Sequence, residues 1–434
     1  MLTPKKKRIM KKINNYTLPL NILSSLLVIL LAITSLACQE DEDEVTGMPT
    51  IDRIRYTDPE TADSAFTRAT LGSTLAIMGR NLGTTQQVYL NGYSVGVNPA
   101  YVTNDNVIVT ITDSVPTVAT DPNVSNMLRL VTKGGETSIP FQTLPPAPQI
   151  SRVGNEYLKP GDNLTLFGRY FYFIDTVFFP GEGNYVTEGF TANSTGSKLT
   201  VKVPDGLDFS EGNFVSVVTQ SGGSATSRRT QIYDGNGMVA DFDTDGALEW
   251  PWNWGWGISG NMIVPSIGPV NGIDGNFGAI DMELPPKGGW SNDKVMNFTN
   301  WGGAQIFPTS PADKYAPSTP AGKFEIRVEI AISTASSIED VELMIWFPDN
   351  KGNELTTNVP LVDYVSTTDG TWYTVSTNLS QLTSGNVRLG TYADLLAGDT
   401  GGVKQLRLVI QNYGTDGVPV VMGVDNVRVV RAEQ

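Results

Sequence analysis

Apolar and polar residues alternate along most of the chain with a period of two, which is the pattern of β-strands that bury one face. The clearest runs lie in the C-terminal half, at Phe324–Ile330, Val341–Phe347, Thr371–Val375, Gln405–Gln411 and Val424–Val430. Residues typical of turns, mainly Gly, Asn and Pro, separate such runs. The pattern therefore predicts an all-β protein whose strands pair antiparallel and bury one face each.

The N-terminal part departs from this pattern. Residues 1–12 are basic, and residues 18–37 are mostly apolar and end in small residues, which is typical of a secretory signal peptide. The single cysteine of the chain, Cys38, follows directly. Ser35–Cys38 resembles a bacterial lipobox, with serine in the position usually held by leucine. The resemblance implies that residues 1–37 are a lipoprotein signal peptide and that Cys38 is lipidated; a simple transmembrane anchor is the alternative.

An acidic run, Glu40–Glu44, comes next. It resembles the signal that directs lipoproteins of Bacteroidetes to the outer face of the outer membrane, although a solvated linker would look the same. Residues 38–47 are therefore predicted to be an acidic surface-export linker. The protein is expected to be lipid-anchored in the outer membrane, facing the cell exterior, rather than to span the membrane.

The next part of the chain contains two copies of one pattern. Gly72–Leu82 and Gly161–Phe171 share the motif G-x-x-L-x-[IL]-x-G-R-[NY]-[LF] at an offset of 89 residues. Each copy lies in a unit that opens with a proline-led strand. The motif resembles the IPT/TIG family of immunoglobulin-like domains, which implies two sandwiches, at residues 48–146 and 147–234. In secreted bacterial proteins such domains are mostly spacers, and we expect a spacer role here.

Residues 235–434 contain no third copy. Their order of motifs resembles carbohydrate-binding jelly rolls in three places: a Phe-Asp strand opening at Asp241–Asp243, a G-x-W-Y strand at Gly370–Tyr373 and a closing strand at Val424–Val427. The resemblance implies a jelly-roll glycan-binding domain. Asp241 also begins a D-x-D-x-D-G sequence, but the twelfth position is Trp252 instead of a bidentate glutamate. An EF-hand-type calcium loop is therefore not expected.

Half of the tryptophans are concentrated in one stretch. Of eight in the chain, four stand at alternate positions within residues 249–257. Extended backbone would place alternate side chains on one side. However, Pro251, Gly255 and Gly257 disfavour a regular strand there. The stretch is predicted to be a glycine-supported aromatic loop region, whose flat surface suits the apolar face of a pyranose ring.

The predicted glycan-binding residues are tryptophans, most of them in loops rich in Gly and Asn. They are Trp252, Trp254, Trp256, Trp290 and Trp301. Nearby amides are expected to supply directional hydrogen bonds, with ordinary turn hydrogen bonding as the alternative. They are Asn253, Asn292, Asn300 and Gln305. Alternation places Trp346 on the face of its strand opposite Val341 and Leu343, whereas Trp372 is predicted to be a core residue.

Composition excludes several kinds of site. The chain has no histidine and one cysteine, which excludes Ser-His-Asp and Cys-His catalysis, histidine zinc sites and an intrachain disulfide. No cofactor and no metal site are predicted. The first 37 residues hold six of the 30 basic residues and no acidic one, so the remainder carries 24 basic and 45 acidic residues. Such a surface repels nucleic acid, so no nucleic-acid partner is expected.

Together, the lipobox, the tandem IPT/TIG units and the Trp-rich C-terminal domain resemble the surface glycan-binding proteins of Bacteroidetes polysaccharide-utilisation loci, whose last domain is known as a xyloglucan-binding domain. The resemblance implies a non-catalytic cell-surface lipoprotein that captures a plant-type β-glycan on a tryptophan platform. The glycan would be xyloglucan or another β-glucan or β-mannan. The resemblance also implies partnership with a TonB-dependent transporter complex.

Two alternatives remain open. A glycoside hydrolase would use two carboxylates about 5–9 Å apart. Asp274, Asp281, Glu283 and Asp293 lie near the aromatic region in the sequence, but nothing in the sequence marks any pair of them. A surface adhesin would instead use exposed tryptophans as hot-spot residues for a protein partner.

Overall fold

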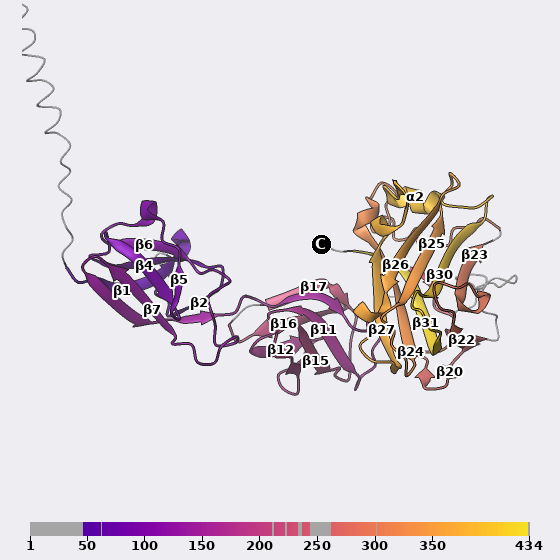
Figure 1. Ribbon diagram of the computed structural model, residues 1–434, viewed down its shortest axis with the longest axis horizontal. Coiled ribbons are helices and arrows are strands. Elements are labelled where there is room, and N and C mark those ends of the chain that lie inside the picture. Colours follow the sequence, from indigo (N-terminus) through magenta and orange to yellow (C-terminus); the bar gives the residue numbers. More distant parts are fainter. Residues whose placement is uncertain are drawn as a thin grey trace, which may run out of the picture. The chain divides into compact units, whose positions relative to one another are not determined.

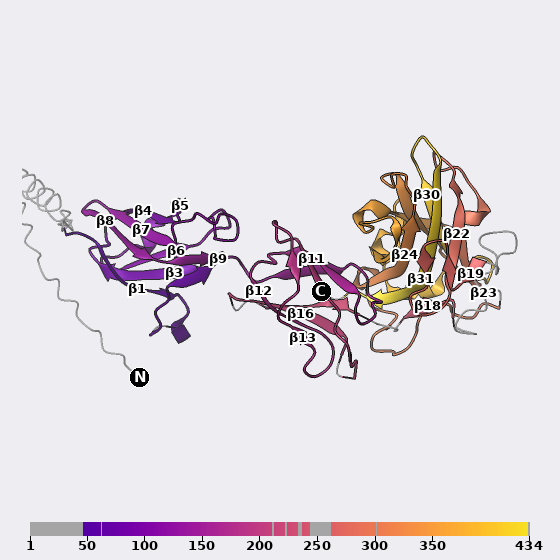
Figure 2. The ribbon, with the colours of Figure 1, turned by 90° about the horizontal axis from the view of Figure 1, so that it is seen from below.

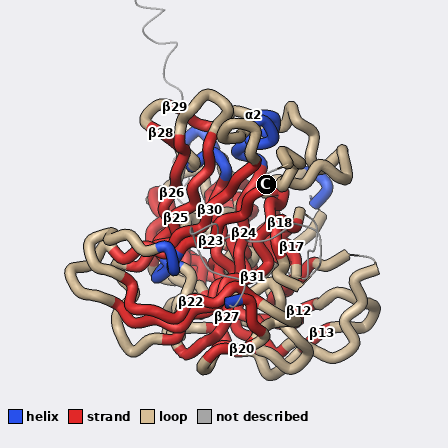
Figure 3. Tube along the Cα trace, turned by 90° about the vertical axis from the view of Figure 1, so that its right-hand side faces the viewer, coloured by secondary structure: helices blue, strands red, loops and turns tan. Residues whose placement is uncertain are grey.

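The structure is a computed structural model. It describes residues 47–61, 63–210, 212–221, 224–232, 237–243, 262–300 and 302–432. Strands make up nearly all of its regular structure (Figure 3). They build two immunoglobulin-like sandwiches followed by a larger C-terminal sandwich, which confirms the predicted all-β fold class. The second sandwich and the C-terminal domain belong to one compact unit, and most of the first sandwich forms another.

The first sandwich contains a three-stranded and a four-stranded sheet (Figure 1). The smaller sheet has the order β1 (Thr50–Tyr56), β3 (Thr74–Arg80), β6 (Asn106–Thr110). The larger has the order β5 (Tyr93–Val95), β4 (Thr85–Leu90), β7 (Met127–Thr132), β8 (Gly135–Pro140). Alternate residues are buried, as the sequence pattern predicts; they include Leu75, Ile77, Val88, Leu90, Leu128 and Leu130. Two short strands, β2 (Arg68–Thr70) and β9 (Gln142–Leu144), pair in parallel.

The second sandwich contains two four-stranded sheets. One has the order β10 (Gln149–Val153), β11 (Asn163–Arg169), β15 (Lys198–Lys202), β14 (Thr191–Ala192). The other has the order β13 (Tyr185–Val186), β12 (Ile174–Phe178), β16 (Phe214–Thr219), β17 (Ser224–Gln231). Leu164 and Leu166 of the repeated motif are fully buried.

Close contact with a neighbouring backbone explains why the second glycine of the repeated motif is required. In both sandwiches the first strand shifts register against its partner, between Ile51 and Arg53 and between Ile150 and Arg152. A Cβ on Gly79 would lie 1.8 Å from the carbonyl oxygen of Thr50, and one on Gly168 would lie 1.9 Å from that of Gln149. Only glycine fits where the bulged strand approaches so closely.

The C-terminal domain is built from two six-stranded sheets. In the first, β19 (Ile263–Val264), β22 (Phe277–Leu284), β31 (Val418–Arg431), β24 (Phe324–Ser333) and β27 (Asp369–Asn378) follow in order, and β18 (Met238–Ala240) also pairs with β31. The second has the order β23 (Val295–Asn300), β30 (Lys404–Asn412), β25 (Val341–Pro348), β26 (Glu354–Pro360), β28 (Thr383–Ser384), β29 (Val387–Arg388). A hairpin of β20 (Ser266–Ile267) and β21 (Val270–Asn271) pairs with neither sheet, but its Val270 packs against Phe277 and Trp372 of the first.

Helical segments in the described residues are short. The α-helix among them is α2 (Tyr392–Ala397), and the 3-10 turns are η1 (Pro59–Thr61), η2 (Pro99–Tyr101), η4 (Asn292–Lys294), η5 (Ala321–Lys323), η6 (Leu361–Asp363) and η7 (Leu379–Gln381). No described helix is long and apolar enough to cross a membrane. The predicted signal peptide and Cys38 lie outside the described residues.

The C-terminal core fills the space between the two sheets. Figure 2 shows β22, β31 and β24 side by side in the first sheet. Phe324, Leu343, Phe347 and Leu408 are among the side chains that pack between the sheets, each at most 1% exposed. Trp372 is buried, as predicted, but in a separate hydrophobic cluster that includes Tyr157 of the second sandwich; there it packs edge-to-face on Phe277 with ring centroids 5.3 Å apart.

The Phe-Asp motif at Asp241–Asp243, which was predicted to open a strand, lies just after strand β18 instead. Strand β18 ends at Ala240, because Phe242 has a φ of 58°, which is incompatible with a continuing strand. Asp243 turns back instead, and its Oδ1 accepts hydrogen bonds from the backbone N and the Nδ2 of Asn276 at 2.6 and 3.0 Å. The conformation of Phe242 thus ends the strand before the motif.

The second sandwich and the C-terminal domain meet at a buried ion-pair network. Glu156, which follows β10, accepts a hydrogen bond from Arg327 Nη1 on Oε1 at 2.6 Å and from Arg428 Nη2 on Oε2 at 2.6 Å. Arg428 also donates to both carboxylate oxygens of Glu329. All four side chains are at most 5% exposed. The second sandwich is therefore attached through charges that no solvent screens.

Burial and pairing act in opposite directions on these charges. Burial lowers the pKa of Arg428, but the carboxylates of Glu329 and Glu156 more than offset this, so the pKa lies well above its ordinary value. Burial raises the pKa of Glu329 although Arg428 opposes it. The Thr374 hydroxyl donates to Glu329 Oε1 at 2.7 Å and accepts from the backbone N of Glu156 at 2.8 Å. Each carboxylate thus has several partners, as a buried charge requires.

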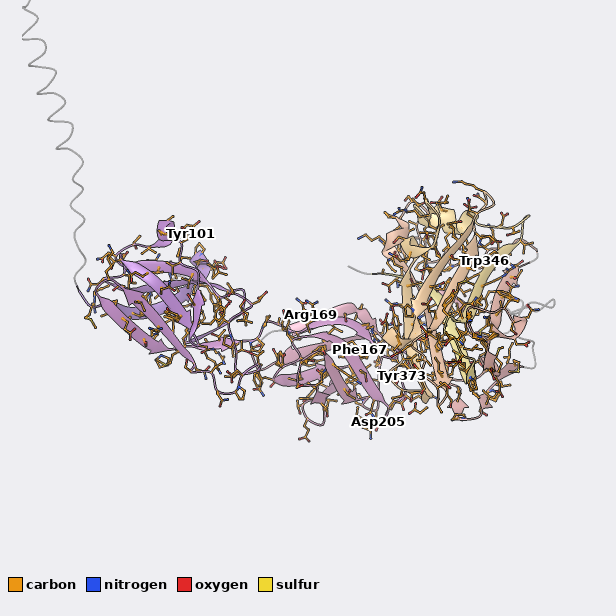
Figure 4. The ribbon with its side chains drawn as sticks, viewed as in Figure 1. Tyr101, Phe167, Arg169, Asp205, Trp346 and Tyr373 are labelled. Atoms are coloured by element: carbon orange, nitrogen blue, oxygen red, sulfur yellow. The ribbon has the colours of Figure 1, made fainter. Side chains whose placement is uncertain are left out.

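A second contact reinforces this junction. The guanidinium carbon of Arg152, in β10, lies 3.7 Å from the ring centroid of Phe167 and 5.0 Å from that of Tyr364 in the C-terminal domain. Its Nη2 donates to the carbonyl oxygen of Asp363 at 2.8 Å. Figure 4 labels Phe167 together with Tyr373 of the C-terminal domain, one from each side of the junction.

Glu156→Gln is expected to lower the free energy of unfolding by about 3–5 kcal/mol, because Arg327 and Arg428 lose a charged partner while staying buried. Urea unfolding at neutral pH would measure the loss. The matched control is Glu136→Gln, which breaks an exposed pair with Arg129 and should cost about 1 kcal/mol or less. Equal losses in the two variants would contradict the role assigned to the network.

Candidate functional site

Four of the five predicted glycan-binding tryptophans fall where the structure gives no description. Trp252, Trp254, Trp256 and Trp301 lie outside the described residues. Trp290 is described, and 52% of its surface is exposed. The structure therefore gives the surroundings of Trp290 alone among the five, and all five assignments stay predictions.

Trp290 lies in the loop between β22 and η4. Its Nε1 donates to Asn292 Oδ1 at 2.9 Å, which holds the indole in the loop. Gly288 donates its backbone N–H to the carbonyl oxygen of Asn412 at 2.7 Å, so the loop runs beside the end of β30. A Cβ on Gly288 would lie 3.2 Å from the ring of Tyr413, a second exposed aromatic side chain. The loop thus contacts Tyr413 at Gly288, and sequence reasoning did not single out Tyr413.

The second sheet of the C-terminal domain has a face that does not contribute to the core between the sheets. We call it the outer face. Strand registers align its residues in two rows across β23, β30, β25 and β26. One row is Asn297, Arg407, Trp346 and Thr356, and the other is Val295, Val409, Met344 and Asn358. The predicted placement of Trp346 opposite Val341 and Leu343 is therefore confirmed.

Trp346 is covered by a charged side chain. The guanidinium carbon of Arg407 lies 4.1 Å from its ring centroid, and 8% of the tryptophan is exposed. Figure 4 labels Trp346 in this sheet. Arg407 Nε also donates to Asn297 Oδ1 at 3.3 Å, and Gln405 Nε2 donates to the same oxygen at 3.2 Å. Burial lowers the pKa of Arg407, but an arginine stays charged. The indole thus supports a half-buried cation.

The edge of the outer face joins the Trp290 loop. Asn358 Nδ2 donates to the hydroxyl of Tyr413 at 2.9 Å, and both residues are exposed. At the other side of the loop, Lys294 Nζ donates to the carbonyl oxygen of Gly289 and to Gln411 Oε1. Lys294 is fully buried, and burial lowers its pKa from 10.5 to about 8. These bonds fix the loop against β30.

Two of the predicted amide donors have structural roles. Asn300 Oδ1 accepts from the backbone N of Gly302 at 2.9 Å, which is turn chemistry. Gln305 donates to the carbonyl oxygen of Leu396 and accepts from the backbone N of Phe307. Asn300 thus makes a turn hydrogen bond, whereas Gln305 joins two segments that are distant in the sequence; the predicted role of both in glycan binding stays a prediction. Asn292 holds Trp290, as described above, and Asn253 lies outside the described residues.

The four candidate carboxylates of a hydrolase come from three parts of the C-terminal domain. Asp281 and Glu283 lie on β22 of the first sheet, Asp293 lies in η4, and Asp274 precedes β22. The pKa of Asp274 is raised, first by burial and then by the neighbouring Asp243. Among the described residues, no three Asp, Glu or Cys side chains are placed to hold a metal ion.

The outer face and the Trp290 loop combine aromatic rings with polar groups. Exposed rings offer flat apolar contact, and Asn358, Arg407 and Thr356 offer hydrogen bonds, which is the composition of a site for a polyhydroxylated ligand. Alternation within Gln405–Gln411 points to Arg407, because it puts that residue on the face opposite the core leucines. No local pattern marks Tyr413, which becomes relevant through its contact with a loop distant in sequence.

Comparison with known proteins identifies relatives of this domain. Residues 232–431 match the family model described as surface glycan-binding protein B xyloglucan binding domain. An IPT/TIG domain-containing protein of Bacteroides ovatus is 37% identical over 157 residues, which are 36% of this chain and 32% of that relative. The aligned part thus spans about a third of the relative's length. These matches confirm the family resemblance predicted from the sequence.

A solved structure shows the same fold. The crystal structure of surface glycan-binding protein PbSGBP-B from Prevotella bryantii aligns with 89% of this chain and 99% of its own, at 20% identity and a TM-score of 0.59. At this identity the likeness shows the fold and not the ligand.

Lys294 is expected to make stability depend on pH. Its pKa is lower in the folded chain, so between about pH 8 and pH 10.5 the unfolded chain binds more protons and the free energy of unfolding rises with pH. Lys294→Met removes this contribution. The difference in unfolding free energy between the unaltered chain and the variant, measured with urea at pH 7.5 and pH 10, should increase at the higher pH.

The control for this measurement is Lys202→Met, because Lys202 lies on β15 and its side chain is exposed. A difference for Lys294→Met that stays constant across the range would show that its ammonium is not desolvated.

Proposed function

Because the C-terminal domain of this chain belongs to the family of surface glycan-binding protein B xyloglucan-binding domains, we propose that the protein captures a plant-type β-glycan at the cell surface without cleaving it. Xyloglucan is the first candidate, and other β-glucans and β-mannans present the same flat pyranose faces. The observation that carries the proposal is that two exposed aromatic side chains, Trp290 and Tyr413, come from a loop and a strand end that contact each other through Gly288.

Binding would proceed by stacking and hydrogen bonding. Each exposed ring contributes roughly 0.5–1.5 kcal/mol, by analogy with aromatic pairs. The loop tryptophans Trp252, Trp254, Trp256 and Trp301 would extend the surface as a tryptophan platform. Asn358 and Arg407 would then bind sugar hydroxyls along the outer face. Because a polysaccharide repeats its units, several weak contacts along the chain add up to useful affinity.

The anchoring and the partner are further parts of the proposal. Lipidation at Cys38 would tie the protein to the outer membrane, and the acidic run after it supports export to the outer surface. The two IPT/TIG-like domains would hold the C-terminal domain away from the membrane. A TonB-dependent transporter complex would receive the captured glycan. These points rest on the sequence resemblance.

Hydrolysis is the alternative that the same experiment addresses. The named relatives are described as binding proteins, which favours capture without cleavage. Electrophoresis of the chain from residue 39 onward, through native gels containing xyloglucan, mixed-linkage β-glucan or β-mannan, measures binding as retardation. Reducing-sugar release, assayed in parallel, measures cleavage. Retardation without release is expected; release would support the hydrolase, and no retardation on any of these glycans would overturn the proposal.

The chain is tested with both IPT/TIG-like domains in place. A fragment beginning at residue 235 would lack Glu156 and leave Arg327 and Arg428 buried without it. Loss of binding in such a fragment would then report misfolding as readily as loss of a ligand contact.

Trp290→Ala and Tyr413→Ala are each expected to weaken binding by about 2- to 10-fold, as the stacking energy above implies. Trp254→Ala and Trp301→Ala should act in the same direction. Tyr101→Ala is the matched control, because Tyr101 is 55% exposed but belongs to the first sandwich; it is labelled in Figure 4. Binding constants from retardation against glycan concentration would measure the effects. Unchanged binding in all four site variants would refute this site.

A further inference from the structure

A cleft opens at the junction between the second sandwich and the C-terminal domain, within one compact unit. Its volume is ≈ 560 Å³, within the range of about 300–1,000 Å³ that suits small ligands. The second sandwich contributes Lys159, Asn163 and Lys198 to its lining, and the C-terminal domain contributes Asp369, Thr371 and Trp372. The cleft is separate from the outer face, because it is lined from β27 of the first sheet and not from the second sheet.

The C-terminal wall of the cleft is held rigidly. Trp372 Nε1 donates to the carbonyl oxygen of Asn271 at 2.7 Å. The Tyr373 hydroxyl and the Thr367 hydroxyl lie 2.7 Å apart in a hydrogen bond. Asp369 Oδ1 accepts from Thr367 Oγ1 at 2.9 Å and from the backbone N of Thr371 at 3.1 Å. These bonds fix the wall before a ligand arrives, so that little entropy is lost on binding.

The charged groups of the lining cancel. Lys159 and Lys198 face Asp162 and Asp369 around the cleft. Hydrogen bonds from Thr371 and Thr367 lower the pKa of Asp369, so its carboxylate is ionised at neutral pH. Neither lysine ammonium forms an ion pair with a described residue, and Lys198 Nζ lies 5.9 Å from the ring centroid of Phe167. The cleft therefore offers hydrogen-bond donors and acceptors without a net charge, in a chain whose net charge is −15.

We propose that this junction cleft is a second carbohydrate-binding site, which takes a neutral oligosaccharide segment between the second sandwich and the C-terminal domain. Ammonium donors and carboxylate and hydroxyl acceptors match the hydroxyls of a sugar chain. An anionic ligand would gain no net attraction from the balanced lining. The inference rests on the proposed function, because it assigns a second site for the same class of ligand.

The second sandwich then has a role besides spacing. The ion pairs of Glu156 with Arg327 and Arg428 hold the two walls together, so the cleft is present before binding. A glycan segment in the cleft would also contact both domains and stabilise their junction. Two sites on one chain would let a single polysaccharide be held at two points, which raises its apparent affinity.

Calorimetric titration of the chain from residue 39 onward with a xyloglucan oligosaccharide tests the inference. The unaltered chain should bind two equivalents, and the double variant Lys159→Met/Lys198→Met should bind one. The matched control is Lys202→Met, on the same strand as Lys198 but outside the cleft, and it should bind two. Thr371→Arg, which places a large side chain in the cleft from an exposed position, should also reduce the number to one.

The variants of the two sites separate the possible results. Trp290→Ala/Tyr413→Ala should weaken one of the two binding events and leave the other unchanged. If the unaltered chain binds only one equivalent, and the Trp290→Ala/Tyr413→Ala variant loses it, the junction site is overturned. The proposed function would still stand. Two equivalents retained in both cleft variants would also overturn it. No binding by the unaltered chain, together with no retardation in glycan gels, would overturn the proposed function itself.

Discussion

The buried ion-pair network around Glu156 is the constraint on which the larger compact unit depends. One carboxylate of the second sandwich satisfies two arginines of the C-terminal domain, Arg327 and Arg428, and all of them are removed from solvent. A buried charge is costly unless its partners are complete, so neither domain can present these groups alone without penalty. The network therefore makes the second IPT/TIG-like domain a structural part of the C-terminal domain. It also creates the cleft at their junction, since the same contacts bring the two walls together.

A sandwich strand has two faces, and in the C-terminal domain they have different uses. The inner face of the second sheet packs against the first sheet with residues such as Leu343 and Leu408. Its outer face carries Trp346, Arg407 and Asn297, which bond to one another instead of filling a core. The alternation that builds the domain thus also places an ordered set of polar and aromatic groups on a face that lies outside this core.

The repeated domains show how one steric condition can preserve a motif. Gly79 and Gly168 occupy equivalent places because a bulged first strand brings a carbonyl oxygen against each of them. The two copies nevertheless differ in their surroundings. In the second copy, Arg152 and Glu156, in and just after its first strand, contact the C-terminal domain. One architecture therefore serves in one place as a sandwich of its own and in another as part of a larger body.

The sequence by itself determined the strands, the buried alternate residues, the repeat and the family, because these depend on local periodicity and on short motifs. It also placed Trp346 on the outer face and Trp372 in the core. It wrongly placed Asp241–Asp243 at the opening of a strand, whereas this motif follows β18, and Phe242 there has a positive φ. Only the tertiary structure decided that Tyr413 lies against the Trp290 loop, that Gln305 donates to the carbonyl oxygen of Leu396, and that Glu156 joins two domains. Glu156 and Arg428 are 272 residues apart in the chain. No periodic pattern links such positions, since what brings them together is the packing of one domain on another.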